Sequence, residues 1–305
     1  MDIIRAALLG GGHWRLTVDS LANIIVTSAL YALIAVGLST IYGVLRVLHI
    51  AHAAVYAVGA WAAYEAFVLV DSFWLALVTA MVVSGIVGVA IYYLLYRPLL
   101  DSPRAVPLLA SIGAFIAIEA LLRQPFLLGP DTVPLAASSG FPELRAGSFR
   151  FSSIQLTIIV VSVVAVVGVY LLIHRTRTGL AWRAITQDRQ MAGSIGINLN
   201  RSITLNFLVG SALAGLAAML AGVYTNTVSA GAGAVISYKA FVIVVLGGLG
   251  NVPGAVLASL LLATSEIVSA RYVGTFLPRD AIAFLVLIAV LLVRPEGLTT
   301  KAVTR

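Results

Sequence analysis

The chain has 305 residues, of which 61% are apolar and only 10% are charged, and its mean hydropathy is +1.05. Soluble domains contain about 45–50% apolar and 25% charged residues. A water-soluble particle of this size could not bury so much apolar surface, so the composition predicts a membrane protein and excludes disorder. The net charge of +7 does not indicate nucleic-acid binding, because basic residues of membrane proteins gather in cytoplasmic loops.

Long apolar runs follow one another along the chain, and none alternates as barrel strands do. They cover residues 20–45, 53–70, 72–96, 105–122, 151–173, 202–238, 240–265 and 281–293. A spanning helix needs about 20 such residues. We predict an all-α polytopic bundle, a single transmembrane domain over residues 1–305. It has about nine spans, with eight or ten as the alternatives.

Residues 1–20 contain too short an apolar stretch for a signal peptide, so the first long run should stay as a membrane anchor. The distribution of Lys and Arg predicts the sidedness. Placing the N-terminus outside puts segments 43–52, 97–104, 174–202 and 294–305 inside, and these hold 11 of the 19 basic residues. The positive-inside rule therefore favours an outer N-terminus and a cytoplasmic C-terminus.

Two loops stand out from the apolar runs. The segment 124–152 is rich in Pro and Gly and is predicted to lie outside. The segment 175–201 is predicted to be a cytoplasmic loop. If residues 180–195 form one helix, most of its apolar side chains fall within an arc of about 140°. Such a helix either lies on the inner leaflet or docks on a soluble partner, and both interpretations stay open.

The sequence lacks the motifs of the common catalytic sites. A phosphate-binding loop needs GxxxxGK[ST], and neither lysine of the chain, Lys239 or Lys301, fits it. Cysteine is absent, and His49 and His52 have no HExxH motif or added carboxylate to complete a metal site. We therefore expect no catalytic residue, no metal and no cofactor bound by this chain.

Four ionisable residues interrupt the apolar runs: Glu65, Glu119, Lys239 and Glu266. Charge inside a membrane is costly, so each should face the bundle interior, a partner or water. Glu119 is spaced to pair with Arg123 one turn later, and Lys239 begins its run and could extend to the interface. Glu65 and Glu266 are candidates for a solute path. A stand-alone proton- or ion-coupled secondary transporter would use the same carboxylates.

Glycine and other small residues mark two further features. The small residues between 210 and 222 repeat at four-residue spacing, which is typical of close helix packing. The segment 247–254, GGLGNVPG, interrupts the run 240–265. It either lines a permeation path at membrane depth or forms a turn between two spans. The full set of candidate solute-path residues is Tyr42, His52, Glu65, Gly247, Gly248, Gly250 and Glu266.

Three separated segments resemble the LivH-type permeases of branched-chain amino acid ABC importers. They are SALYALIAVGLSTIYGVLRVLHIAH (28–52), RTRTGLAWRAITQDRQMAGSIGIN (175–198) and FVIVVLGGLGNVPGA (241–255). The resemblance extends from about residue 20 to RPEG (294–297). Within 49–53 only Ala51 and His52 match the pattern usual in that family.

The resemblance implies that the loop 175–201 holds a coupling helix that inserts into an ATPase subunit. The family usually has Glu-Ala-Ala where this chain has Gln190, Met191 and Ala192, so the first two positions depart from its pattern. The residues to which the resemblance assigns coupling are Arg183, Asp188, Arg189, Gln190, Met191, Ala192, Gly196 and Ile197.

The resemblance also implies the function and the partners. The chain is expected to be one half of a heterodimeric pore in the bacterial or archaeal cytoplasmic membrane. A second homologous permease, two cytoplasmic ATPases and an extracytoplasmic substrate-binding protein would complete the importer, with ATP bound by the ATPases alone. The solute would be a branched-chain amino acid or a related small polar molecule such as urea or an amide. A secondary transporter and a channel or structural subunit are the rivals.

Overall fold

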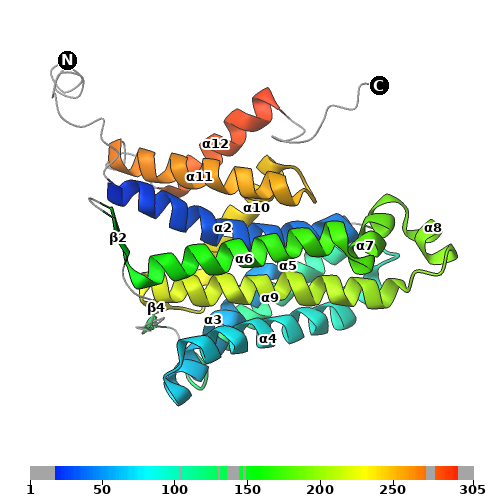
Figure 1. The fold of residues 1–305 in the computed structure, drawn as a ribbon. Coiled ribbons are helices and arrows are strands. Elements are labelled where there is room, and N and C mark those ends of the chain that lie inside the picture. Colours follow the sequence, from blue (N-terminus) through cyan, green and yellow to red (C-terminus); the bar gives the residue numbers. More distant parts are fainter. Residues whose placement is uncertain are drawn as a thin grey trace.

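The computed structural model describes residues 18–103, 105–129, 131–135, 144–146, 149–272 and 279–294, with no account of side chains at 18–19, 144–151 and 271–280. Helices dominate these residues (Figure 1). Their bounds are α2 Val18–Leu45, α3 His52–Val70, α4 Phe73–Ile91, α5 Ala105–Leu122, α6 Ser153–Arg175, α7 Arg177–Gln187, α8 Arg189–Ser194, α9 Leu199–Thr225, α10 Ala232–Gly247, α11 Val252–Tyr272 and α12 Arg279–Val293. A π-helical turn, Tyr92–Tyr96, and a 3₁₀ turn, Arg97–Leu99, extend α4.

The helical fold predicted from the sequence is confirmed. Among the described residues, seven helices are long and apolar enough to cross a membrane, and two further apolar helices, 232–247 and 281–293, are shorter. Their sum agrees with the predicted number of about nine spans. A helix satisfies its own backbone hydrogen bonds, which is why apolar sequence adopts it in lipid. The outer position of the N-terminus stays a prediction.

Four short strands accompany the helices. β1 (Val133–Pro134) pairs antiparallel with β4 (Thr227–Val228), and β2 (Leu144–Ala146) pairs antiparallel with β3 (Phe149–Phe151). The first pair joins the 124–152 segment to the connection between α9 and α10. These strands lie at the end of the bundle opposite α7 and α8 (Figure 1).

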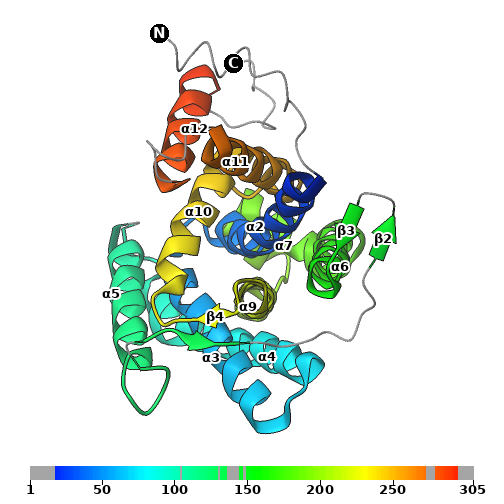
Figure 2. The ribbon, with the colours of Figure 1, turned by 90° about the vertical axis from the view of Figure 1, so that its left-hand side faces the viewer.

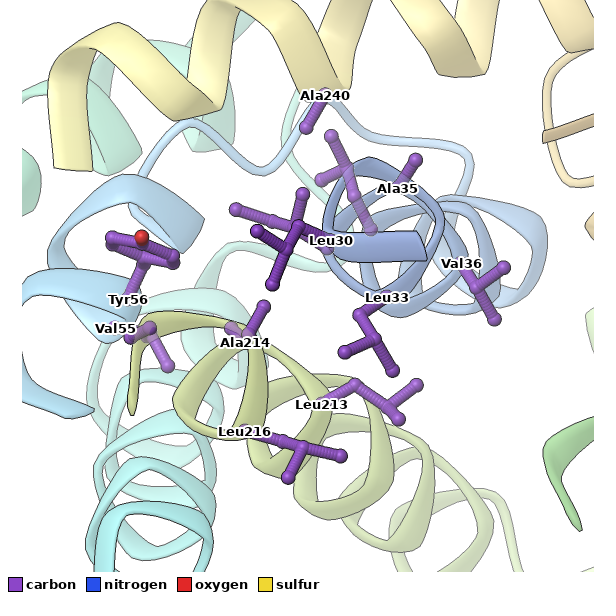
Figure 3. Packing of buried hydrophobic residues seen from close by; sticks show 14 of the residues in the cluster. Leu30, Leu33, Ala35, Val36, Val55, Tyr56, Leu213, Ala214, Leu216 and Ala240 are labelled. Atoms are coloured by element: carbon purple, nitrogen blue, oxygen red, sulfur yellow. The ribbon is translucent and has the colours of Figure 1, made fainter. Parts of the chain in front are cut away.

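Helices α2 and α9 form the centre of the bundle, and α3, α4, α10 and α11 pack around them (Figure 2). Figure 3 shows side chains of α2, α3 and α9 meeting in the core, among them Leu33, Tyr56 and Leu213. The small residues at 210–222 permit this packing as predicted. A Cβ on Gly210 would meet the Gly37 carbonyl, and one on Gly215 would meet the Ala80 carbonyl.

The outer helices α5 and α6 expose most of their apolar side chains. Gly113 of α5 and Gly168 of α6 have open space where a Cβ would point. Such surfaces are expected where helices contact lipid chains rather than other helices. The ion pair predicted on α5 is present, with Arg123 Nη2 2.5 Å from Glu119 Oε1.

Two expectations from the sequence are wrong. Residues 180–195 do not form one helix, because the chain breaks at Asp188, whose carboxylate accepts a hydrogen bond from the Met191 amide and caps α8. Lys239 does not extend to an interface. It lies in the middle of α10 and is buried, because its ammonium pairs with Glu266 of α11.

Candidate functional site

Helices α7 and α8 project from one end of the bundle (Figure 1). The Thr176 hydroxyl accepts a hydrogen bond from the Gly179 amide and starts α7, and Gly179 lies directly on the carbonyls of Leu172 and Ile173. Trp182 is buried, and its indole Nε1 donates to the Ser202 carbonyl at 2.8 Å. These contacts fix α7 between α6 and α9.

Three apolar side chains of this region face away from the protein, and we call them the coupling surface. They are Leu180, Met191 and Ile195, which are 60%, 61% and 69% exposed. Ile185 and Ala192 are buried and hold the two helices to the bundle. Exposed apolar side chains beside arginines, at the end of a bundle, are typical of a surface that another protein or a lipid headgroup layer covers.

Of the remaining residues assigned to coupling, those from 188 to 197 lie in or beside α8, whereas Arg183 lies on α7 and lines a cavity described below. Gln190 is exposed on α8, and Arg189 and Ile197 are partly buried. Gly196 follows α8 with φ +88° and open space around it, a backbone conformation that favours glycine. The structure therefore places these residues on α7, on α8 and in the turn after it, and their role in coupling stays a prediction.

A cavity of about 640 Å³ lies directly behind α7, and we call it the α7 cavity. Arg183, Thr186 and Gln187 of α7 line one wall, and polar residues of α2 and α9 line the opposite wall. Ser39 Oγ and Asn206 Oδ1 in that wall have no hydrogen-bond partner among the described residues. Unpaired buried polar groups are costly, so these two atoms make this wall the polar side of the cavity.

Arg46 connects the central helix to α7. It follows α2 with φ +53°, and its Nη2 donates to the Thr186 carbonyl at 2.6 Å. Movement of α7 would therefore also displace Arg46 at the end of α2 and change the shape of the cavity between the two helices.

The glycine segment that follows α10 is a turn rather than a stretch of open backbone. Gly248 and Gly250 have φ values of +96° and +80°, and the Asn251 side chain accepts a hydrogen bond from the Gly254 amide at the start of α11. Gly250 lies against Gly43 of α2 and lines the α7 cavity. Of the two interpretations left open, the structure shows a turn that also borders a cavity.

A second cavity, of about 270 Å³, lies between α2, α5 and α10, and we call it the His49 cavity. Tyr42 lines both this cavity and the α7 cavity. His49 Nδ1 lies 2.8 Å from the Tyr96 hydroxyl, and its ring packs against Phe207. His49 thus borders the cavity, whereas His52 lies buried behind it against Gly37.

Replacing Tyr96 by Phe should test this histidine contact. The change removes the only hydrogen bond that the structure gives the described His49 ring and leaves a buried nitrogen unpaired. We expect a loss of about 1–3 kcal/mol in stability, measured as a lower thermal unfolding midpoint in detergent. Tyr170→Phe on the exposed face of α6 is the matched control. An equal change in both variants would contradict the assignment.

Two candidates for the solute path lie elsewhere. Glu65 is partly exposed near the end of α3 and does not line the cavities described above. Glu266 is 3% exposed and joins Tyr31 of α2 and Lys239 of α10 in a buried cluster. Its Oε2 accepts hydrogen bonds from the Tyr31 hydroxyl at 2.7 Å and from Lys239 Nζ at 3.1 Å.

Three further residues were not singled out from the sequence: Asn206 lines the α7 cavity, and Tyr96 and Phe207 contact His49. The available signal for Asn206 was an amide inside the apolar run 202–238, in which Asn226 is a second one. The two aromatic residues carried no such signal, because aromatic side chains in apolar helices are most often part of the core.

Comparison with known proteins places this geometry in context. The sequence profile of the family described as "Branched-chain amino acid transport system / permease component" matches residues 20–293. The chain is 36% identical over 299 residues to the high-affinity branched-chain amino acid transport system permease protein BraD of Pseudomonas aeruginosa, covering 92% of this chain and 94% of that protein. It is 31% identical over 287 residues to LivH of Escherichia coli K12, covering 90% and 93%.

More distant similarity is also present. The chain is 29% identical to the probable branched-chain amino acid transport permease protein LivH of Methanocaldococcus jannaschii, covering 92% of this chain and 91% of that protein. A solved structure titled PsaBC from Streptococcus pneumoniae in complex with Fab aligns with 96% of this chain and 95% of its own at 12% identity, with a TM-score of 0.48.

A bundle of membrane-spanning helices that matches this family over residues 20–293 is a membrane permease subunit rather than an enzyme. The chain belongs to the family of permease components of branched-chain amino acid transport systems. The resemblance found in the sequence is thereby confirmed.

Proposed function

We propose that the chain is the permease subunit of an ABC importer for branched-chain amino acids. It forms half of a pore with a second homologous permease. Two ATPases on the cytoplasmic side bind and hydrolyse ATP, and a substrate-binding protein delivers the solute on the other side. Family membership and the relatives' names support this assignment.

The position of α7 supports a mechanism by which ATPase movement reaches the cavity. Helix α7 carries Leu180 of the coupling surface and also lines the α7 cavity through Arg183, Thr186 and Gln187, so the helix that a partner would move is itself a cavity wall. Closure of the ATPases on ATP would displace α7 and α8 together. Because Arg183 and Thr186 belong to that wall, the displacement would change the shape of the cavity with no further relay. Such coupling requires an element with two arrangements whose equilibrium is shifted both by the ATPase contact and by what the cavity binds.

The cavities also suggest the course of the solute. The α7 cavity and the His49 cavity adjoin α2 at positions 39–46 and 38–42, and a third cavity adjoins it at positions 27–31. A series of cavities along one central helix supports a path that follows α2. The first two cavities share Tyr42, so this side chain lies between them on the expected path.

The test is uptake by proteoliposomes that contain this chain with its partner permease, ATPases and binding protein. We expect import of radiolabelled leucine that requires ATP and every partner. Import by this chain alone, driven by a proton or sodium gradient, would instead establish a secondary transporter. Import of urea or an amide in place of leucine would refute the assigned solute.

A further inference from the structure

Helix α10 forms a wall of two different cavities. One is the His49 cavity, and the other is the third cavity, which has a volume of about 170 Å³ and which we call the Lys239 cavity. The residues of α10 that line them are Ala234, Ser237, Tyr238, Phe241 and Val244 on the His49 cavity, and Val235, Ile236 and Lys239 on the Lys239 cavity. An α-helix turns by about 100° per residue, so the two sets lie on opposite faces. The stretch 235–239 therefore has unfilled space on both sides, whereas protein interiors are normally close-packed.

The two ends of α10 are held by close backbone contacts. A Cβ on Gly233 would meet the carbonyl oxygen of Ala53 in α3, and a Cβ on Gly247 would meet the backbone of Gly254 in α11. Most residues from 240 to 247 are also buried. Packing therefore fixes the ends and the second half of α10 more firmly than the stretch between the two cavities.

A buried ion pair holds that stretch. Lys239 Nζ lies 3.0 Å from Glu266 Oε1 of α11, and it donates hydrogen bonds to Glu266 Oε2 at 3.1 Å and to the Tyr31 hydroxyl of α2 at 2.9 Å. The Tyr31 hydroxyl donates to the same Oε2 at 2.7 Å. One side chain of α10 thus contacts both α2 and α11, which lie beside α10 in the bundle (Figure 2).

Stability alone does not account for this ion pair. Because desolvation offsets the attraction between buried charges, a pair of apolar side chains of similar size is often equally stable or more so. Apolar contacts tolerate small rotations of a helix. The hydrogen bonds of Lys239 are directional, so its ammonium must face the Glu266 carboxylate and the Tyr31 hydroxyl at once. The charges therefore specify one orientation of α10 relative to α2 and α11.

We infer that Tyr31, Lys239 and Glu266 are positioning residues that hold α10 in one of two orientations, an inference that rests on the proposed function. In this structure the three side chains are joined. When Lys239 separates from Glu266, α10 moves into the space on one of its sides, so that one cavity shrinks while the other grows. Glu266 keeps its hydrogen bond from Tyr31 in the second orientation, and water in the Lys239 cavity hydrates the ammonium. The three residues act on transport through α10 and need not contact the solute.

The double variant K239M/E266M tests this role in the complete importer. It removes both charges without leaving either one unpaired, so the thermal unfolding midpoint should stay close to that of wild type. Because α10 is then no longer fixed in one orientation, we expect the leucine imported per ATP hydrolysed to fall at least about tenfold, the effect of one charge-assisted hydrogen bond on an equilibrium. A pair with a merely structural role would not change this ratio while the midpoint is kept.

Exchanging the two charges is the rescue experiment. The variant K239E/E266K keeps an ion pair of the same combined side-chain length between α10 and α11. We expect it to restore leucine import per ATP to within about threefold of wild type, because the coupling between the two positions is retained.

Tyr31→Phe is a milder variant that keeps the ion pair. It removes the hydroxyl that joins α2 to the pair, and we expect leucine import per ATP to fall about fivefold. The matched control is Tyr93→Phe, which removes a hydroxyl that joins α4 to Thr204 of α9 without contact to α10. This control should keep the wild-type ratio.

Four results would overturn the inference. Import per ATP by K239M/E266M within about twofold of wild type is the first, and equal losses in Tyr31→Phe and Tyr93→Phe are the second. The third is failure of K239M/E266M to fold, and the fourth is a folded K239E/E266K variant that does not recover import per ATP. Either of these would make the pair a purely structural element. Failure of the wild-type importer to take up leucine would refute the proposed function instead.

Discussion

Replacing Gly215 by Val is expected to destabilise the bundle by about 3 kcal/mol or more, at the upper end of the range for overpacked cores. Gly215 lies where α9 crosses α3 and α4. A Cβ there would overlap the Ala80 carbonyl oxygen and would also press on Ser84 Oγ. The first contact is with backbone, so no rotamer change relieves it and the helices must separate. The measurement is the thermal unfolding midpoint of the purified chain and its yield in the membrane.

Gly168→Val is the matched control for this variant. Gly168 lies in α6 with no atom within 4 Å of the point where a Cβ would lie, and its helix exposes apolar side chains around it. Valine there should change the unfolding midpoint little, because it adds only lipid-facing apolar surface. If the two variants were equally stable, close contact between α9 and α4 would not be what holds the bundle together.

The helices and their close packing could be predicted because both depend on local composition. Apolar runs of the required length specify spanning helices, and small residues at four-residue spacing specify close crossings. The break at Asp188 was harder to predict, since a helix with one intruding carboxylate and two helices separated by a cap share the same apolar pattern. The capping hydrogen bond to Met191 decides between them.

The candidate site could be predicted only in part. Helices α7 and α8, to which the resemblance assigns coupling, come from one continuous segment of sequence, so the position of this segment could be predicted. The cavities depend on which side chains distant helices bring together, as when Asn206 Nδ2 of α9 donates a hydrogen bond to the Thr40 carbonyl of α2. The pairing of Lys239 with Glu266 is a contact across 27 positions. The sequence indicated that Lys239 and Glu266 are each costly charges within apolar runs. It did not indicate that the two side chains pair with each other.

The double variant M191E/I195E is expected to abolish uptake while the protein still inserts. Both side chains face away from the bundle, so carboxylates there remain hydrated and cost the chain little stability. Against an ATPase groove they would be desolvated beside apolar atoms. Losing two anchors should cost at least about 2 kcal/mol of docking energy, or roughly a 30-fold loss of affinity. Co-purification of the ATPase with the permease, measured alongside ATP-dependent leucine uptake, reports this loss.

The conservative variant M191L/I195L separates docking from any structural role of these positions. It keeps apolar side chains of similar size, so the ATPase should remain bound and uptake should stay within about twofold of wild type. If α7 and α8 instead lie on lipid headgroups, M191E/I195E would retain the ATPase. Their apolar side chains would then serve membrane contact, and the coupling assignment would be wrong. The contrast between the two double variants therefore decides what the exposed apolar residues of this unit contact.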